Sequence, residues 1–79
     1  MKRTLLRTAH MTVGDEAFEV RYFEVQTMRG HRRYSAEILL GPRDRIILDD
    51  DSASNLEARA TRLVPATVYS RVLARATAA

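Results

Sequence analysis

The sequence predicts an α+β fold, in which a four-stranded antiparallel sheet is followed by a C-terminal helical segment. Three observations support this prediction. Apolar residues alternate with polar ones over most of the chain up to residue 50, as they do in half-buried strands. After residue 51 the apolar residues recur about every 3.6 positions, which is the period of an α-helix. The three glycines all fall between β-like segments, where turns are expected.

The length of 79 residues predicts one small domain, residues 1–79. The chain has no cysteine, so disulfides, thiolate metal ligands and a thiol nucleophile are excluded. Oligomerisation is then the remaining common way to stabilise so small a fold. The chain opens Met1-Lys2-Arg3 and continues with alternating residues rather than an apolar signal or membrane span. We therefore expect a cytoplasmic protein that does not contact a membrane.

The first two strands are expected at 3–13 and 16–27, joined by a tight turn at Gly14-Asp15. This turn fixes the pairing of the two strands. It places Met11 opposite Phe18, and the same pairing continues along the hairpin. The further pairs expected are Ala9 with Val20, His10 with Glu19, Thr8 with Arg21 and Leu6 with Phe23.

The third and fourth strands are expected at 33–40 and 45–49. Gly41-Pro42-Arg43-Asp44 reverses the chain between them, because Gly, Pro and Asp favour turns. A four-residue connection would set Ile47 beside Ile38 and Ile46 beside Leu39.

The helical segment is expected over about 54–76. Ser54 with Glu57 three residues later matches a capping box, and the acidic run Asp49–Asp51 lies where carboxylates favour a helix N-terminus. Pro65 lacks a backbone donor and its ring crowds the preceding turn. The helix is therefore expected to be kinked at Pro65 or split into 54–63 and 65–76. The apolar residues at helical spacing are Leu56, Ala60, Leu63, Val64, Val68, Val72 and Leu73.

Residues for catalysis are few. His10 is expected opposite Glu19, and a cross-strand polar pair explains the two better than an acid–base pair without a third group or a pocket. The run Asp49–Asp51 lacks the glycine and the later ligands of a calcium loop. No glycine-rich phosphate loop and no zinc spacing occurs. We therefore expect no enzyme activity, no cofactor and no metal.

The formal net charge of +3 raises the question of nucleic-acid binding. The sharpest candidate is the second hairpin, whose basic residues would contact phosphates while a tyrosine stacks on bases. The candidate contacts are Arg29, His31, Arg32, Arg33 and Tyr34. Arg71 and Arg75 are a second candidate strip on the helix. A solvated turn explains the same residues, and we favour it because twelve of the thirteen basic residues are arginine, a bias that base composition can impose.

The expected strand pairing leaves one sheet face for a partner. Strands two to four would present one apolar set to the helix and a second set to the opposite side. The expected dimer or partner face consists of Phe18, Val20, Leu39 and Ile46. The opposite set consists of Phe23, Val25, Ile38 and Ile47.

A small homodimer that binds another macromolecule is therefore the first functional hypothesis, with a different protein as the other occupant of that face. Nucleic-acid binding through the second hairpin is the alternative. The order of elements is similar to that of single-strand DNA-binding coactivators and of small β-rich antitoxins. That similarity is one of topology alone, and no residue motif transfers a functional residue to this chain.

Overall fold

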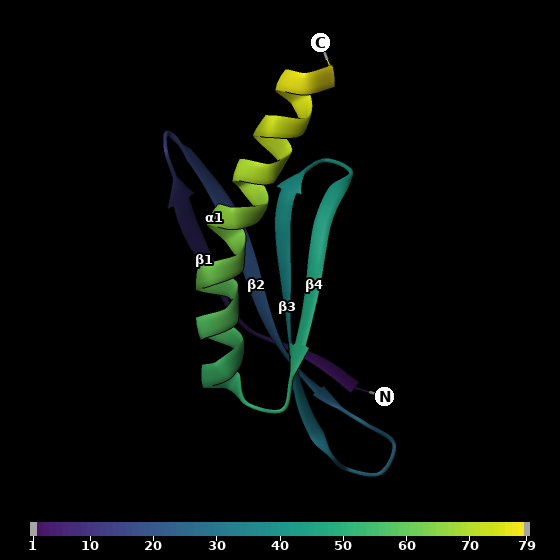
Figure 1. Ribbon diagram of the computed structural model, residues 1–79. Helices are drawn as coiled ribbons and strands as arrows, with labels where there is room; N and C mark the ends of the chain where they lie inside the picture. The colour runs from purple at the N-terminus through teal and green to yellow at the C-terminus, as the bar shows by residue number, and fades with distance from the viewer. Residues whose placement is uncertain (1, 79) are drawn as a thin grey trace.

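The computed structural model describes the backbone of residues 2–78 and the side chains of residues 2–74. Four strands precede one helix, in the order predicted from the sequence. The strands are β1 (Lys2–Val13), β2 (Glu16–Gln26), β3 (Arg32–Gly41) and β4 (Asp44–Asp50), and the helix is α1 (Ala53–Ala78). The strands form one sheet, and α1 lies across one of its faces (Figure 1). The α+β prediction is confirmed.

The sheet is an antiparallel meander in which each strand pairs with its neighbours in the chain. The turn between β1 and β2 lies at Gly14-Asp15, as predicted. Gly14 has a φ of 61°, a left-handed conformation that glycine adopts without steric cost. Met11 pairs with Phe18 and His10 with Glu19, so the register expected for the turn end of this hairpin is confirmed.

Farther from this turn, the pairing of β1 with β2 differs from the prediction by one residue. Leu5, rather than Leu6, lies opposite Phe23, because the register shifts between Leu5 and Arg7. Such a shift is a β-bulge, in which one strand carries an extra residue. Leu6 is that residue, and the bulge separates the N-terminal end of β1 from the regular ladder.

The pairing of β3 with β4 was also predicted one residue out of place. Ile46 lies opposite Ile38, and Arg45 lies opposite Leu39. The register shifts between Leu39 and Gly41 at the turn, so the connection is not the regular four-residue loop that we expected. Since side chains alternate between the two faces of a strand, this slip moves Ile46 to the face of Ile38.

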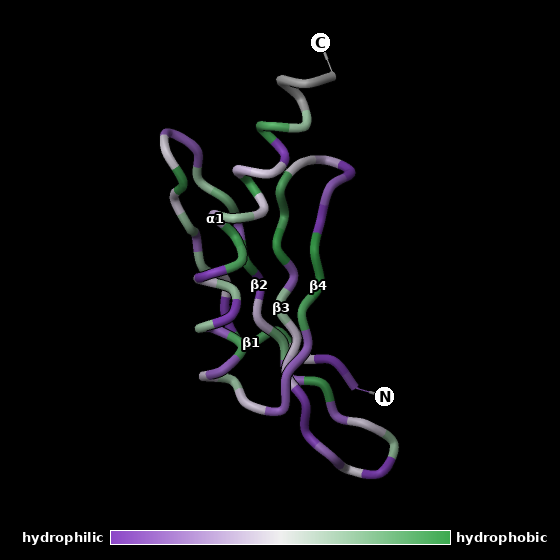
Figure 2. The backbone as a smooth tube through the Cα atoms, in the orientation of Figure 1, coloured by the Kyte–Doolittle hydropathy of each residue, from purple (hydrophilic) through white to green (hydrophobic). Residues whose placement is uncertain are grey.

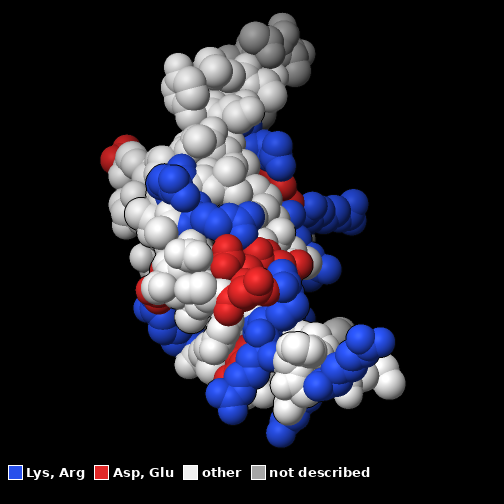
Figure 3. Space-filling view, turned by 60° about the horizontal axis from the view of Figure 1, so that its bottom comes forward, with Lys and Arg blue, Asp and Glu red and all other residues white. Residues whose placement is uncertain are grey.

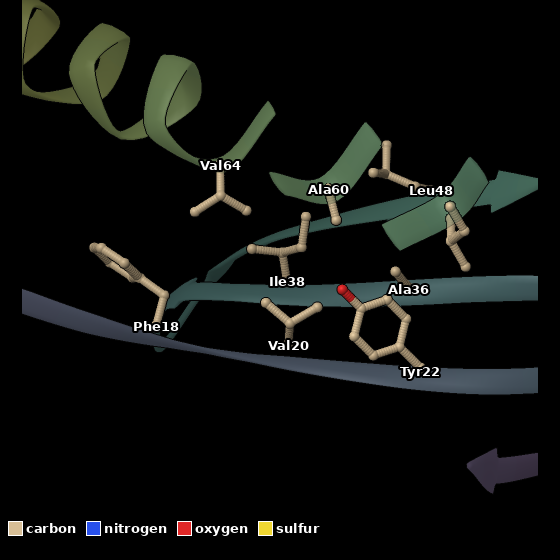
Figure 4. Packing of buried hydrophobic residues seen from close by; sticks show 9 residues of the cluster. Phe18, Val20, Tyr22, Ala36, Ile38, Leu48, Ala60 and Val64 are labelled. Atoms are coloured by element: carbon tan, nitrogen blue, oxygen red, sulfur yellow. The ribbon is translucent and has the colours of Figure 1, made fainter. Parts of the chain in front are cut away.

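The core lies between α1 and one face of the sheet, where Figure 4 shows the side chains of both layers meeting. Figure 2 shows hydrophobic residues along the middle of β4 and along the part of β3 that leads to the β3–β4 turn. The buried residues of β2 and β3 are Phe18, Val20, Tyr22, Ala36 and Ile38. Those of β4 and α1 are Leu48, Leu56, Ala60 and Val64.

Ser52, rather than Ser54, caps the start of α1. The backbone N–H of Asn55 donates to the Ser52 hydroxyl at 3.3 Å, which satisfies one of the donors left free at a helix start. The predicted capping box does not form, because the helix begins at Ala53 and Ser54 already lies inside it. Glu57 forms an ion pair with Arg7 of β1 instead.

Pro65 does not split the helix, so the expected division into 54–63 and 65–76 is wrong, and the kink expected as the other outcome stays a prediction. α1 is one helix from Ala53 to Ala78 with Pro65 inside it. The proline leaves the carbonyl of Thr61 without its usual donor, but both residues are exposed, so water can reach that carbonyl. The buried Val64 next to the proline keeps the helix packed on the sheet at this point.

Candidate interaction surfaces

The residues considered for catalysis or metal binding are occupied by other contacts or lie far apart. The carboxylate of Glu19, opposite His10, forms an ion pair with Arg21 at 2.7 Å. His31 lies beyond the end of β2, in the turn at the opposite end of the sheet. Within the described residues, no three His, Asp or Glu side chains gather where they could hold a metal ion.

The acidic run Asp49–Asp51 helps to anchor the helix. The Asp50 carboxylate accepts the backbone N–H of Ser52 at 2.9 Å and an N–H of Arg59 at 3.1 Å. The bond from Ser52 and the nearby charge of Arg59 lower the pKa of Asp50 below its usual value. Asp51 forms an ion pair with Arg33. These two carboxylates therefore already have cationic partners from within the chain.

The turn between β2 and β3 projects from the rest of the sheet (Figure 1). Met28 at its tip is 92% exposed, and Gly30 has a φ of 80° that closes the turn. Basic side chains surround this projecting hairpin, and a compact acidic patch lies close to it (Figure 3). The shape and charge of the hairpin are those of a surface that could contact a polyanion.

Two of the arginines of this hairpin already have acidic partners. Arg32 lies 3.2 Å from a carboxylate oxygen of Glu24, and Arg33 pairs with Asp51. Arg29 is exposed and forms no ion pair with any other described residue. Tyr34 is half-buried and packs against the core under α1, so it does not join the arginines at the tip. The structure thus separates the predicted stacking residue from the predicted phosphate contacts.

The four residues predicted to form a dimer or partner face do not lie together. Phe18 and Val20 are buried under α1, and Ile46 packs against the same core. Leu39 lies on the opposite face, paired with Glu19 and Arg45. Three of the four residues therefore share the face that α1 covers. The prediction failed because it also placed Leu39 on that face, whereas the pairing of Val20 with Ile38 puts Leu39 on the other.

The outer face of the sheet, away from α1, mixes charged and apolar side chains. Its apolar residues are Leu5, Phe23, Val25, Leu39 and Ile47. Glu37 lies among them with its side chain only 9% exposed, and it accepts a hydrogen bond from Arg3 at 3.1 Å. The Arg3 guanidinium also lies 3.7 Å from the centroid of the Phe23 ring, a cation–π contact. Arginine side chains therefore cover part of this apolar surface.

A more exposed apolar surface lies on the helix. We call residues 53–64 of α1 its proximal half and residues 65–78 its distal half. The distal half extends past the sheet (Figure 1), and its apolar side chains are largely exposed: Tyr69 by 66%, Val72 by 49% and Leu73 by 48%. Helical spacing puts Arg62, Ala66, Tyr69 and Leu73 on one side, facing away from the sheet, with Val72 at its margin. We call this side the outer face of α1.

A groove of about 530 Å³ opens between the distal half of α1 and the turn end of the sheet. Its apolar lining comes from Phe18, Leu40, Pro42, Val68 and Ala74. Arg71 crosses from the helix to the start of β4 and donates two hydrogen bonds to Asp44, at 2.9 and 3.1 Å. This paired contact raises the pKa of Arg71 above its usual range.

The spacing of the apolar residues along the helix indicates the outer face of α1, because these residues do not all lie on one side. The sequence-based prediction placed Val72 and Leu73 in the same stripe as Leu56. Leu73 follows Val64 by nine positions, and at 100° per residue the two side chains differ in direction by about 180°. The helix therefore carries apolar residues on two sides, and the sheet covers one of them.

No helix within the described residues is long and apolar enough to cross a membrane. Comparison with known proteins found no protein family, no curated protein and no solved structure that matches this chain significantly.

Proposed function

We propose that this protein is a non-enzymatic interaction module, a homodimer that binds another macromolecule. The observation that carries the proposal is the distal half of α1, which extends past the sheet with Tyr69, Val72 and Leu73 exposed. Contiguous exposed apolar surface on a small soluble domain typically marks an interaction site.

The length of the distal half supports the same proposal. Helices shorter than about 12–15 residues are marginal in water without packing partners. The distal half has 14 residues, from 65 to 78. Val68 packs against the core and Arg71 bonds to Asp44, whereas Tyr69, Val72 and Leu73 are exposed. A partner that covers its outer face would stabilise the helix and remove apolar surface from water.

Sedimentation velocity at micromolar concentration tests the dimer. We expect a species of twice the mass of one chain, with a fraction that rises with concentration. A single monomeric species over the whole concentration range, up to the millimolar limit, would contradict the proposal.

Nucleic-acid binding is a second candidate, favoured by the projecting hairpin with its exposed Arg29. It ranks lower because phosphates would have to compete with Glu24 for Arg32 and with Asp51 for Arg33. Eight arginines form ion pairs with carboxylates among the described side chains, so much of the positive charge is locally compensated. These eight are Arg3, Arg7, Arg21, Arg32, Arg33, Arg45, Arg59 and Arg71.

Salt dependence tests this second candidate. If the hairpin contacts phosphates, replacing Arg29, Arg32 and Arg33 by alanine should flatten the log–log salt slope of oligonucleotide binding by about two to three units. A control variant replaces Lys2, Arg43 and Arg45, which removes the same charge elsewhere. We expect weak or absent binding at low ionic strength. Tight binding that the hairpin variant abolishes and the control variant keeps would make nucleic-acid binding the leading candidate.

A further inference from the structure

Two surfaces of this chain complement each other in polarity and charge. One is the outer face of α1, with Ala66, Tyr69 and Leu73 as its apolar residues. The other is the groove at the turn end of the sheet, lined by Phe18 and Leu40 among others. Both are apolar at their centre, and the charges at their margins have opposite signs.

The margin of the helix surface is basic. α1 has no acidic residue after Glu57, whereas Arg62 lies on the outer face in line with Tyr69 and Leu73. Arg62 is exposed and forms no ion pair with any other described residue. A surface that covers this side of the helix is therefore favoured if it brings carboxylates.

The margin of the groove is acidic on its open side. Arg71 bonds to Asp44 on the side of the groove next to the β3–β4 turn. A second molecule would therefore approach the groove from the side of the β1–β2 turn. Glu16 lines the groove there, and Asp15 precedes it in the turn. Neither carboxylate forms an ion pair within the part of the chain that the structure describes.

A contact between the outer faces of two identical helices fits the charges less well. It would bring the two copies of Arg62 together, and α1 has no acidic residue after Glu57 that could pair with them. Like charges brought together in this way oppose association. Contact between the outer face of one chain and the groove of the other removes this conflict.

We propose that a second copy of this chain covers the groove, with the outer face of its α1 packed against the side of the β1–β2 turn. The contact is reciprocal, so that each copy supplies one helix face and one groove, as a twofold symmetric dimer allows. Tyr69 and Leu73 of one copy meet the groove of the other, and Arg62 lies near Asp15 and Glu16. This inference rests on the dimer of the proposed function and names its interface.

Charge reversal on each surface tests the interface. The helix variant carries Arg62→Glu, and the turn variant carries Asp15→Lys with Glu16→Lys. When either variant pairs with itself, like charges face each other at both contacts. Its dimer dissociation constant should therefore rise at least about tenfold. In an equimolar mixture the helix variant meets the turn variant at one contact and native charges meet at the other. The mixture should therefore form heterodimers about as tightly as the unmodified chain.

Arg29→Glu is the matched control, because it reverses one exposed arginine at the opposite end of the sheet. It should leave the dimer unchanged, and circular dichroism should report the same helix content for all variants. A turn variant that dimerises as well as the unmodified chain would overturn this interface and leave the dimer intact. An unmodified chain that stays monomeric would overturn the dimer itself.

Discussion

The two halves of α1 carry similar apolar residues but meet different surroundings. In the proximal half Leu56, Ala60 and Val64 are at most 1% exposed, whereas Tyr69, Val72 and Leu73 of the distal half are about half exposed or more. Length explains the difference. A helix of 26 residues is about 39 Å long, whereas the ten residues of β3 span about 33 Å and the seven of β4 about 23 Å. The helix is therefore longer than the strands on which it packs, and its last turns extend beyond the sheet.

The largest expected effect comes from shortening a leucine in each half. Leu56→Ala should lower the free energy of unfolding by about 2–5 kcal/mol, because it leaves a cavity between α1 and the sheet. Leu73→Ala removes the same atoms from a half-exposed site and should cost less than about 1 kcal/mol in the monomer. Urea unfolding at a concentration low enough to keep the chain monomeric measures both.

The difference between these two leucine variants decides whether the halves are distinct. Equal losses of stability would mean that the distal half packs as tightly as the proximal half. The comparison would then be wrong. At higher concentration Leu73→Ala should also weaken the dimer, whereas an effect on the monomer alone would argue against its place in the interface.

Pro65 stands at the boundary between the two halves and offers the next largest effect. Pro65→Ala restores a backbone donor for Thr61 and should stabilise the chain by about 1–3 kcal/mol, since proline is strongly unfavourable inside a helix. Thermal unfolding measures this gain. Thr67→Ala, two residues later, is the control and should gain only a few tenths of a kcal/mol. A loss of stability on replacing Pro65 would show that the proline itself contributes packing.

Much of the fold was accessible from the sequence because it depends on local signals. The turn at Gly14-Asp15 set the register of the first hairpin, and Met11 pairs with Phe18 as expected. Alternating and helical periods separated strands from helix. These signals act over a few residues, so they survive without knowledge of tertiary contacts.

The errors arose where one extra residue changed the register or where length mattered. The shift beside Leu39 put Ile46 rather than Ile47 opposite Ile38. The pairing of Val20 with Ile38 put Leu39 on the face opposite Phe18 and Val20, so the four predicted residues do not share one exposed face. No residue near Leu6 of a type that favours turns indicated the bulge in β1. The outer face of α1 was missed because the number of helical residues that the sheet can cover depends on three-dimensional packing.

The first turn of α1 anchors the proximal half, and its cap offers a smaller effect. Ser52→Ala removes the hydroxyl that accepts the N–H of Asn55 and should lower the free energy of unfolding by about 1 kcal/mol. Ser54→Ala is the matched control and should cost less, because Ser54 lies inside the helix. Chemical unfolding of the two variants compares them. A larger loss of stability for Ser54→Ala than for Ser52→Ala would instead support the capping box of Ser54 and Glu57 that was predicted from the sequence.

The smallest effect concerns the pH dependence of this same anchor. The pKa of Asp50 lies below its usual value of 3.8 because the carboxylate accepts the Ser52 N–H and faces Arg59. A carboxyl whose pKa is lower in the folded chain stabilises the fold above its unfolded pKa and loses that contribution as the pH falls through the folded pKa. Asp50 therefore contributes fully at neutral pH, and its contribution should decline below about pH 4.

Asp50→Asn isolates this contribution, because it keeps the shape of the side chain and removes the charge. We expect the variant to be less stable than the unmodified chain at pH 6 and the difference to shrink as the pH falls below about 4. Thermal unfolding across this range measures it, with Asp49→Asn as the control, because Asp49 is exposed and its carboxylate makes no bond to the start of the helix. The two halves of α1 also predict where the loss begins. Hydrogen exchange in the Asp50→Asn variant should speed up first in the amides of the opening turn, which Asp50 anchors through Ser52 and Arg59. If the distal half responded first instead, its stability would depend on the start of the helix more than on the sheet or a second copy, and the division of α1 into a buried half and a more exposed half would fail.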